Sequence, residues 1–394
     1  MSSRDRRKRP RANPVYTAQV PHYAAQHETF AAARAEDPRW LVELRADAIA
    51  RFSELGFPST RLEEWRYTNV APLAKLAFEL ETGETSPEIP THLGSILDSK
   101  DRPFALLNTA FVSKVSVVTA RRNESRNEVV RLDFESCAAI QHPRAFIQLE
   151  EGSRATVVVD HTSGAAGPGF TNLVVEADIG PNAHLDLVFL QREHDEHFHV
   201  SNIGCRVARD GRFTVNTLTV GGALIRNDLD VLLADEGATC DLRGLFIGEG
   251  RRLVDNHTSV DHAMPHCSSR ELYKGILGGH SKGIFRGHVL VRPDAQKTDA
   301  TQSNPNLLLG EGAEIDTKPQ LEIYADDVRC AHGATIGQLD EDALFYLRSR
   351  GVGLDDARSL LIHAFANEIV AALPEAVGEV VHDVIDGAVR RATE

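Results

Sequence analysis

The pattern of apolar and polar positions changes twice along the chain. Between about residues 103 and 338, short runs rich in Val, Ile, Leu and Thr alternate with turns that contain Gly, Asp or Asn, which is typical of β-strands. Examples of these runs are 155–160, 171–177, 184–190, 212–220 and 319–325. No convincing helical periodicity interrupts the pattern over this region. The pattern predicts a core that is mainly β.

Glycines that precede the β-type runs recur along the same region. They lie 21 to 31 residues apart, except for one gap of 46 residues, and they are Gly152, Gly180, Gly211, Gly237, Gly283, Gly312 and Gly333. We interpret the long gap as two units, which gives a repeat of about 25 residues. A β-type repeat of this length predicts a solenoid, and a parallel β-helix is its natural form. A β-sandwich would also contain short strands, but without such a period.

Helical periodicity flanks the β-type region. Apolar residues at helical spacing predict a helix over 38–56, ended by Gly56 and Pro58, and a polar linker follows at 81–91. Beyond residue 339 we expect three helices, which begin at Asp340, Asp355 and Pro374.

The chain is therefore predicted to have four parts. These are a disordered basic tail (1–14), an N-terminal helical domain (15–100), a parallel β-helix core (101–338) and a C-terminal helical domain (339–394). The C-terminal helices carry a set of apolar side chains: Leu344, Phe345, Leu360, Leu361 and Phe365. Such a helical end could cap the solenoid, present a face to another protein, or do both.

Composition narrows the classes of protein that this chain can belong to. Its 394 residues are 42% hydrophobic and 25% charged, which is ordinary for a globular protein. A net charge of −14 argues against a nucleic-acid-binding core, although residues 1–14 are strongly basic. No run of 18 apolar residues predicts a membrane span. Five scattered cysteines without a Cys-x-x-Cys pair favour reduced thiols in a cytosol.

The sharpest candidate chemistry is a Cys-x-His pair, Cys330 and His332, in a segment expected to form a strand. Residues two apart on a strand project from the same face. A thiolate and an imidazole on one face can bind iron or zinc, yet two ligands do not complete a four-coordinate site. The pair therefore suggests an open or shared metal site, completed from outside this chain. The alternative is that Cys330 only packs, as free cysteines often do.

Three other motifs carry weaker signals. The segment GHSKG at 279–283 matches a nucleophile elbow, but a β-type run rather than a helix follows Ser281, which argues against a hydrolase. The segment HDEHFH at 194–199 is either a polar turn or a zinc or nickel site in which His197 and His199 share a face with His194 nearby. A further set could form a zinc site only if a loop brought its members together: His257, His262, His266 and Cys267. No phosphate-binding G-x-x-x-x-G-K-[ST] segment occurs.

Residues 255–365 resemble the SufB/SufD family of the SUF iron–sulfur cluster assembly system. The most specific part of the resemblance lies between 273 and 351, and the segment RLEEWRYTNVAPL at 61–73 resembles the N-terminal region of the same family. The segment CAHGAT at 330–335 is similar to the SufD branch, whereas the SufB branch typically shows CEHEAT. A SufB-type paralogue is therefore the nearer alternative, and a stand-alone β-solenoid metal-dependent enzyme is the more distant one.

The resemblance implies a set of expectations. The fold would be a right-handed parallel β-helix flanked by helical domains, and the chain would be a non-catalytic scaffold subunit with no nucleotide site. It would pair with SufB through the β-helix cores and dock the ATPase SufC through the C-terminal helices, which include Leu344, Phe345, Leu360, Leu361 and Phe365. A transient iron–sulfur cluster would form between the two subunits, with His332 and, less securely, Cys330 facing it. A homodimer could form in isolation, and neither nucleic acid nor a membrane is an expected partner.

Overall fold

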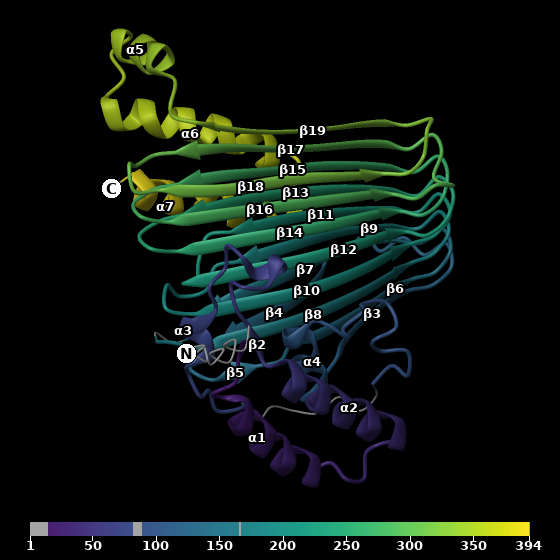
Figure 1. Ribbon diagram of the computed structural model, residues 1–394. Coiled ribbons are helices and arrows are strands. Elements are labelled where there is room, and N and C mark those ends of the chain that lie inside the picture. Colours follow the sequence, from purple (N-terminus) through teal and green to yellow (C-terminus); the bar gives the residue numbers. More distant parts are fainter. Residues whose placement is uncertain (1–14, 82–88, 165–166, 394) are drawn as a thin grey trace, which may run out of the picture.

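Two long parallel sheets form the centre of the molecule, with helices at both ends of the chain (Figure 1). The computed structural model describes residues 15–81, 89–164 and 167–393. The basic tail expected at 1–14 and most of the linker expected at 81–91 lie outside the described residues. Among the helices that are described, none combines the length and the apolar character needed to cross a membrane.

Strands that follow one another in the chain alternate between the two sheets. The first sheet contains β3 (Ser116–Ala120), β5 (Ile140–Gln141), β6 (Arg144–Leu149), β8 (Phe170–Ile179), β10 (Phe198–Val207), β12 (Leu224–Leu233), β14 (Leu253–His262), β16 (Lys282–Val291) and β18 (Glu314–Ile323). The second sheet contains β4 (Val130–Ser136), β7 (Arg154–Ser163), β9 (His184–Gln191), β11 (Arg212–Thr219), β13 (Thr239–Gly248), β15 (Ser268–Leu277), β17 (Asp299–Leu308) and β19 (Arg329–Gly337). Parallel pairing of every second strand makes the core a β-solenoid, so the predicted mainly β fold is confirmed. Its right-handed sense stays a prediction.

The predicted repeat of about 25 residues was too short. In the second sheet, paired residues of successive coils lie 27 to 31 positions apart, from Arg154 opposite His184 to Asp299 opposite Arg329. The glycines that suggested the shorter period do not occupy one structural position. Gly152 and Gly237 lie in turns before the second sheet, whereas Gly283 lies inside β16.

A left-handed backbone position, rather than glycine itself, recurs once per coil. Seven residues with φ between 54° and 73° occupy it: Asn123, Gly152, Asn182, Asp210, Gly237, His266 and Lys297. Each donates its backbone N–H to a carbonyl of the next coil, as Gly152 does to Pro181 at 2.8 Å. Glycine enters this region without steric cost, but Asn, Asp and other residues can also occupy it. Because only two of the seven are glycines, glycine spacing alone misjudges the period.

Side chains that alternate inward from both sheets form the solenoid interior. This cluster includes Val157, Phe189, Phe213 and Phe285, all at most 1% exposed. Helices cover outward-facing apolar residues on part of each sheet, so those parts of the sheets are buried on both faces.

The N-terminal helices cover part of the outer face of the first sheet, around β8, β10 and β12. They are α1 (Val20–Ala32), α2 (Arg39–Leu55), α3 (Ala71–Ala74) and α4 (Pro103–Ala110), joined by a 3₁₀ turn at Glu63–Trp65. The helix predicted over 38–56 is confirmed as α2, and Gly56 follows it with φ +65°. The expectation that the β-type region begins at about residue 103 without a helix was wrong at its start, because α4 is buried over its whole length and so shows no amphipathic pattern.

The C-terminal helices are α5 (Glu341–Ser349), α6 (Leu354–Val370) and α7 (Glu375–Thr393). Asp340 caps α5 as predicted, since its side chain accepts hydrogen bonds from the backbone of Asp342 and Ala343. The cap expected at Asp355 was wrong: Gly353 precedes α6, and Asp355 lies in its first turn. Helices α6 and α7 pack on the outer face of the second sheet, while α5 stands away from it (Figure 1). The division into four domains stays a proposal.

Candidate functional site

The last coil of the solenoid ends in two edge strands. β19 pairs only with β17, and β18 pairs only with β16, among the strands that the structure describes. Figure 1 shows β19 as the outermost strand, at the opposite end of the solenoid from α1 and α2. An edge strand presents unpaired backbone N–H and C=O groups, so this end of the solenoid is a template for a further strand.

Cys330 and His332 lie on β19, and both point toward the interior side of this open end. Their partners on β17 are Ala300 and Gln302, which are 0% and 3% exposed and face inward. The expected strand and the shared face of the pair are therefore confirmed. Cys330 is half-buried and packs against the interior cluster, and this burial raises the pKa of its thiol. His332 is exposed.

A buried polar pair lies directly beneath His332 and was missed in the sequence. Gln302 pairs with Glu271 on β15, and its amide donates a hydrogen bond to the Glu271 carboxyl group. Burial raises the pKa of Glu271 to about 7. The detectable signal was a glutamate at an inward-facing position of a strand, which is expensive to bury without a role or a partner. The two interior layers below His332 are thus polar.

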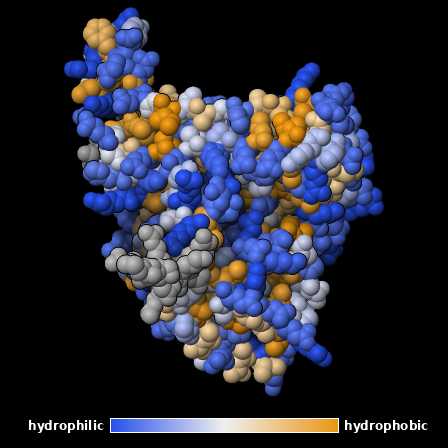
Figure 2. All heavy atoms as spheres, viewed as in Figure 1, coloured by the Kyte–Doolittle hydropathy of each residue, from blue (hydrophilic) through white to orange (hydrophobic). Residues whose placement is uncertain are grey.

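Apolar side chains surround the same open end. Ile323, Tyr324 and Ile336 are 40%, 63% and 54% exposed. In Figure 2 apolar surface reaches the edge of the molecule along which β18 and β19 run. Two unpaired strand edges together with exposed apolar residues are typical of a surface that binds another protein.

The pair offers metal ligands but does not complete a site by itself. No group of three potential ligands that includes Cys330 or His332 converges within the described residues. A thiol and an imidazole at a strand edge can contribute part of a metal site whose other ligands come from a second chain.

The other sequence candidates are dispersed in the structure. His257 faces outward from β14, whereas His262 faces inward and shares a 2.8 Å hydrogen bond with Ser269. His266 occupies a left-handed turn position, and the Cys267 thiol donates to the Asp235 carbonyl at 3.2 Å. No loop folds these residues into one site.

The motif around Ser281 has no nucleophile geometry. Ser281 is fully buried in the turn between β15 and β16, and its hydroxyl donates to the Gly278 carbonyl at 2.8 Å. A strand follows it, as the sequence indicated, and not the helix that an elbow requires.

The HDEHFH segment differs from a simple polar turn. His194 is exposed, but His197 and His199 are buried and lie close to the carboxyl group of Glu193. His199 Nδ1 is 2.7 Å from Glu193 Oε1, and His197 Nε2 is 3.8 Å from the same oxygen. The segment thus brings two of its histidines inside the solenoid.

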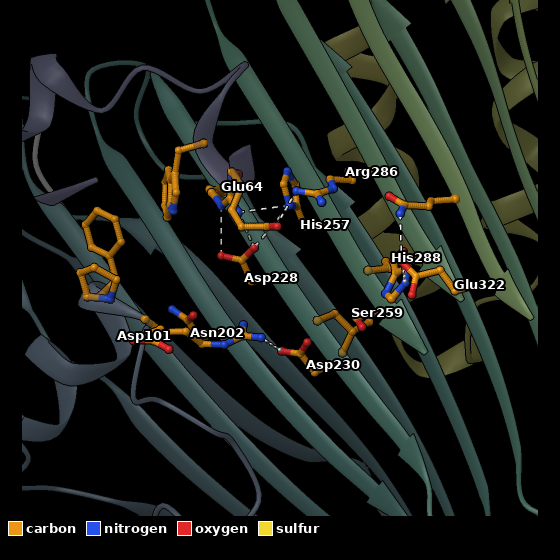
Figure 3. A pocket seen from close by; sticks show the side chains of 18 residues that line it. Glu64, Asp101, Asn202, Asp228, Asp230, His257, Ser259, Arg286, His288 and Glu322 are labelled. Carbon is orange, nitrogen blue, oxygen red and sulfur yellow. Dashed lines mark hydrogen bonds and ion pairs between the residues drawn. The ribbon is translucent and has the colours of Figure 1, made fainter. Parts of the chain in front are cut away.

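A groove of about 460 Å³ separates the N-terminal segment from the first sheet (Figure 3). Arg226 lies at its base, where it pairs with Asp228 at 2.8 Å and Asp255 at 2.8 Å and stacks 3.8 Å from the Trp65 ring. It also donates to the Glu64 carbonyl at 2.9 Å. Through these contacts, the charged groups at the base of the groove hold the segment 61–73 on the solenoid.

The C-terminal side chains expected to bind a partner differ in exposure. Phe345 on α5 and Leu360 on α6 are 75% and 53% exposed, whereas Leu344 is only 8% exposed. Leu361 and Phe365 are half-buried, and Phe365 packs on the sheet. Phe345 and Leu360 are therefore the two members of the set that are free to contact another molecule.

Comparisons with known proteins agree with this arrangement. Residues 132–365 match the family model described as "SUF system FeS cluster assembly, SufBD core domain", and residues 20–93 match "SufBD protein N-terminal region". The chain is 31% identical to the iron–sulfur cluster assembly protein SufD of Escherichia coli over 362 residues, which cover 81% of this chain and 86% of that protein. It is 33% identical to a SufBD family protein of Synechocystis (73% and 66% covered) and 30% identical to one of Mycobacterium leprae (69% and 71% covered).

Proposed function

The chain belongs to the SufBD family of the SUF iron–sulfur cluster assembly system, as a SufD-type member, and from this we propose that it contributes one half of a cluster-assembly site at the open end of its solenoid. The other half comes from a SufB subunit. The chain acts as a non-catalytic scaffold, in the cytosol, and docks the ATPase SufC through its C-terminal helices. Iron and sulfide are the cargo of this site and not resident cofactors.

The observation that carries the proposal is the position of the Cys-x-His pair. Cys330 and His332 face the interior side of a strand that pairs on one side only. A SufB strand added to each free edge would extend both sheets across the boundary and bring its own ligands opposite His332. The exposed apolar residues Ile323 and Ile336 would be buried in the same contact.

Sharing ligands between two chains explains how a scaffold can both hold and release a cluster. His332 offers an imidazole to iron, and the partner would supply the remaining ligands. Separation of the two subunits removes ligands from the metal, so a small movement of the interface changes how firmly the cluster is held.

The C-terminal helices are suited to transmit such a movement. Lys274 on β15 forms a 2.6 Å ion pair with Glu368 on α6 and donates to the Phe365 carbonyl at 2.9 Å. Helix α6 is thereby anchored to the second sheet, the sheet that carries β19. A pull on α5 and α6 by an ATP-driven partner would act on the coils next to the open end.

The decisive experiment is anaerobic reconstitution with SufB and SufC, followed by iron and sulfide analysis. We expect His332→Ala to lower the cluster yield at least tenfold while the complex still forms. Thr335→Ala is the matched control, because Thr335 is exposed on the opposite face of β19. A full cluster yield with His332→Ala would exclude the ligand role.

A further inference from the structure

A second group of ligand-type side chains lies deep inside the solenoid, far from the open end. His161 is on β7, His199 is on β10, and Glu193 lies in the turn that joins β9 to β10. The three residues are 0%, 0% and 2% exposed. One ligand atom from each lies within 4.8 Å of the others, and no second group of three such residues converges in the part of the chain that is described.

Four buried polar atoms of this group have no hydrogen-bond partner in the described structure. They are both ring nitrogens of His161, Nε2 of His199 and Oε2 of Glu193. Buried polar atoms in proteins are nearly always satisfied, because removing them from water is costly. Each of the three converging residues therefore has at least one buried polar atom that is available to a bound ligand.

The protonation states suit a cation. Burial acts to raise the pKa of Glu193, but a positive charge at the neighbouring His199, together with its hydrogen bond, lowers this pKa to about 2, so a positive charge beside the carboxyl group keeps it ionised. Burial lowers the pKa of His161 to about 3, so its imidazole is neutral. A neutral imidazole and a carboxylate are the forms in which these side chains bind a metal.

We propose that His161, Glu193 and His199 bind one divalent transition-metal ion inside the solenoid, as a two-histidine, one-carboxylate site for zinc or ferrous iron. Bonds of about 2.1 Å place ligand atoms at most about 4.2 Å apart, so the ion draws the group together by a few tenths of an ångström. No cysteine takes part.

Neighbouring residues hold the carboxylate in place. His197 shares a 2.9 Å hydrogen bond with Thr171, which is 3.1 Å from Ser136, and the Ser136 hydroxyl donates to Glu193 Oε1 at 3.4 Å. Polar groups behind a ligand fix its orientation in this way in metal sites. The arrangement leaves Glu193 Oε2 for the ion.

The site is structural and separate from the cluster-assembly end. β7 and β19 are six strand positions apart, which corresponds to about 29 Å at 4.8 Å for each position. Phe134 stacks on His161 with ring centroids 5.1 Å apart, and Phe134 in turn lines a hollow of about 520 Å³ at the first coil. An ion behind this ring exchanges slowly and ties together β7, β10 and the turn between β9 and β10.

The test is metal analysis of the full-length chain produced in defined medium with zinc or iron as the only added transition metal. We expect about one ion per chain, and loss of at least four-fifths of it in Glu193→Gln, which keeps the size of the side chain but replaces the charged ligand. His194→Ala is the matched control, because His194 is exposed in the same turn. The double variant Cys330→Ser with His332→Ala should retain the ion.

Two further measurements guard against a variant that fails to fold. Cobalt-loaded chain should show visible ligand-field bands without the thiolate charge-transfer absorption that a cysteine site gives. The unaltered chain should melt at a lower temperature after unfolding and refolding in chelator than after refolding with zinc. Three results would each overturn the proposal. These are an equal metal content in Glu193→Gln and the unaltered chain, no metal in the unaltered chain, and loss of the ion only in the Cys330 and His332 double variant.

Discussion

Gln302 lies one layer below His332, and it donates a hydrogen bond to the carboxyl group of Glu271, which lies one layer further down. Glu271 Oε1 and Gln302 Oε1 have no other partner in the described structure. The pair is therefore incomplete when Glu271 is ionised, and it gains a donor when the carboxyl group takes up a proton.

This arrangement predicts a pH-dependent stability. Folding raises the pKa of Glu271 from 4.5 to about 7. Its contribution to the free energy of unfolding is therefore most favourable below pH 4.5 and is lost as the pH rises through 7. The loss amounts to roughly 3 kcal/mol. Urea unfolding of Glu271→Gln should show a higher free energy of unfolding than the unaltered chain at pH 8, and the difference should shrink at pH 5. An equal difference at both pH values would contradict the assignment.

Cys330 provides a second prediction. Its thiol is half-buried, packs on the interior cluster and has a raised pKa, so it is a poorer ligand in the isolated chain than His332. We expect Cys330→Ser to reduce the cluster yield of the reconstituted complex by less than threefold, against at least tenfold for His332→Ala. A loss as large as that of His332→Ala would make Cys330 an essential ligand.

The apolar rim of the open end predicts how the SufB contact can be broken. Ile336 is 54% exposed on β19, so a charged side chain is tolerated in the isolated chain but has to be desolvated in the complex. Ile336→Asp should weaken SufB binding at least tenfold and leave the melting temperature within about 2 °C. Thr335→Asp, on the other face of the strand, serves as the control, and co-purification with SufB is the measurement.

The exposed C-terminal residues predict the SufC contact. Phe345→Asp and Leu360→Asp change side chains that are 75% and 53% exposed, and they should abolish capture of SufC while the circular dichroism spectrum is unchanged. Leu344 is a poor choice, because it is 8% exposed and its replacement disturbs the packing of α5. Unchanged SufC capture by both variants would remove α5 and α6 from the docking surface.

Much of the fold could be predicted from short-range patterns in the sequence. Alternation of apolar residues indicated the strands, the two-residue spacing placed Cys330 and His332 on one face, and Asp340 and Gly56 marked helix ends. These features depend on a few consecutive residues, so they can be deduced without knowing where distant parts of the chain lie.

The tertiary structure alone decided which coils meet and at what register. The left-handed turn position is filled by residues as different as Gly237, His266 and Lys297, so no residue type reveals the coil length. His161 and Glu193 come together because stacked coils bring residues about thirty positions apart into contact, and local periodicity does not contain that information. The open end likewise depends on β18 and β19 remaining unpaired on their outer sides, which is a property of the stack and not of either strand.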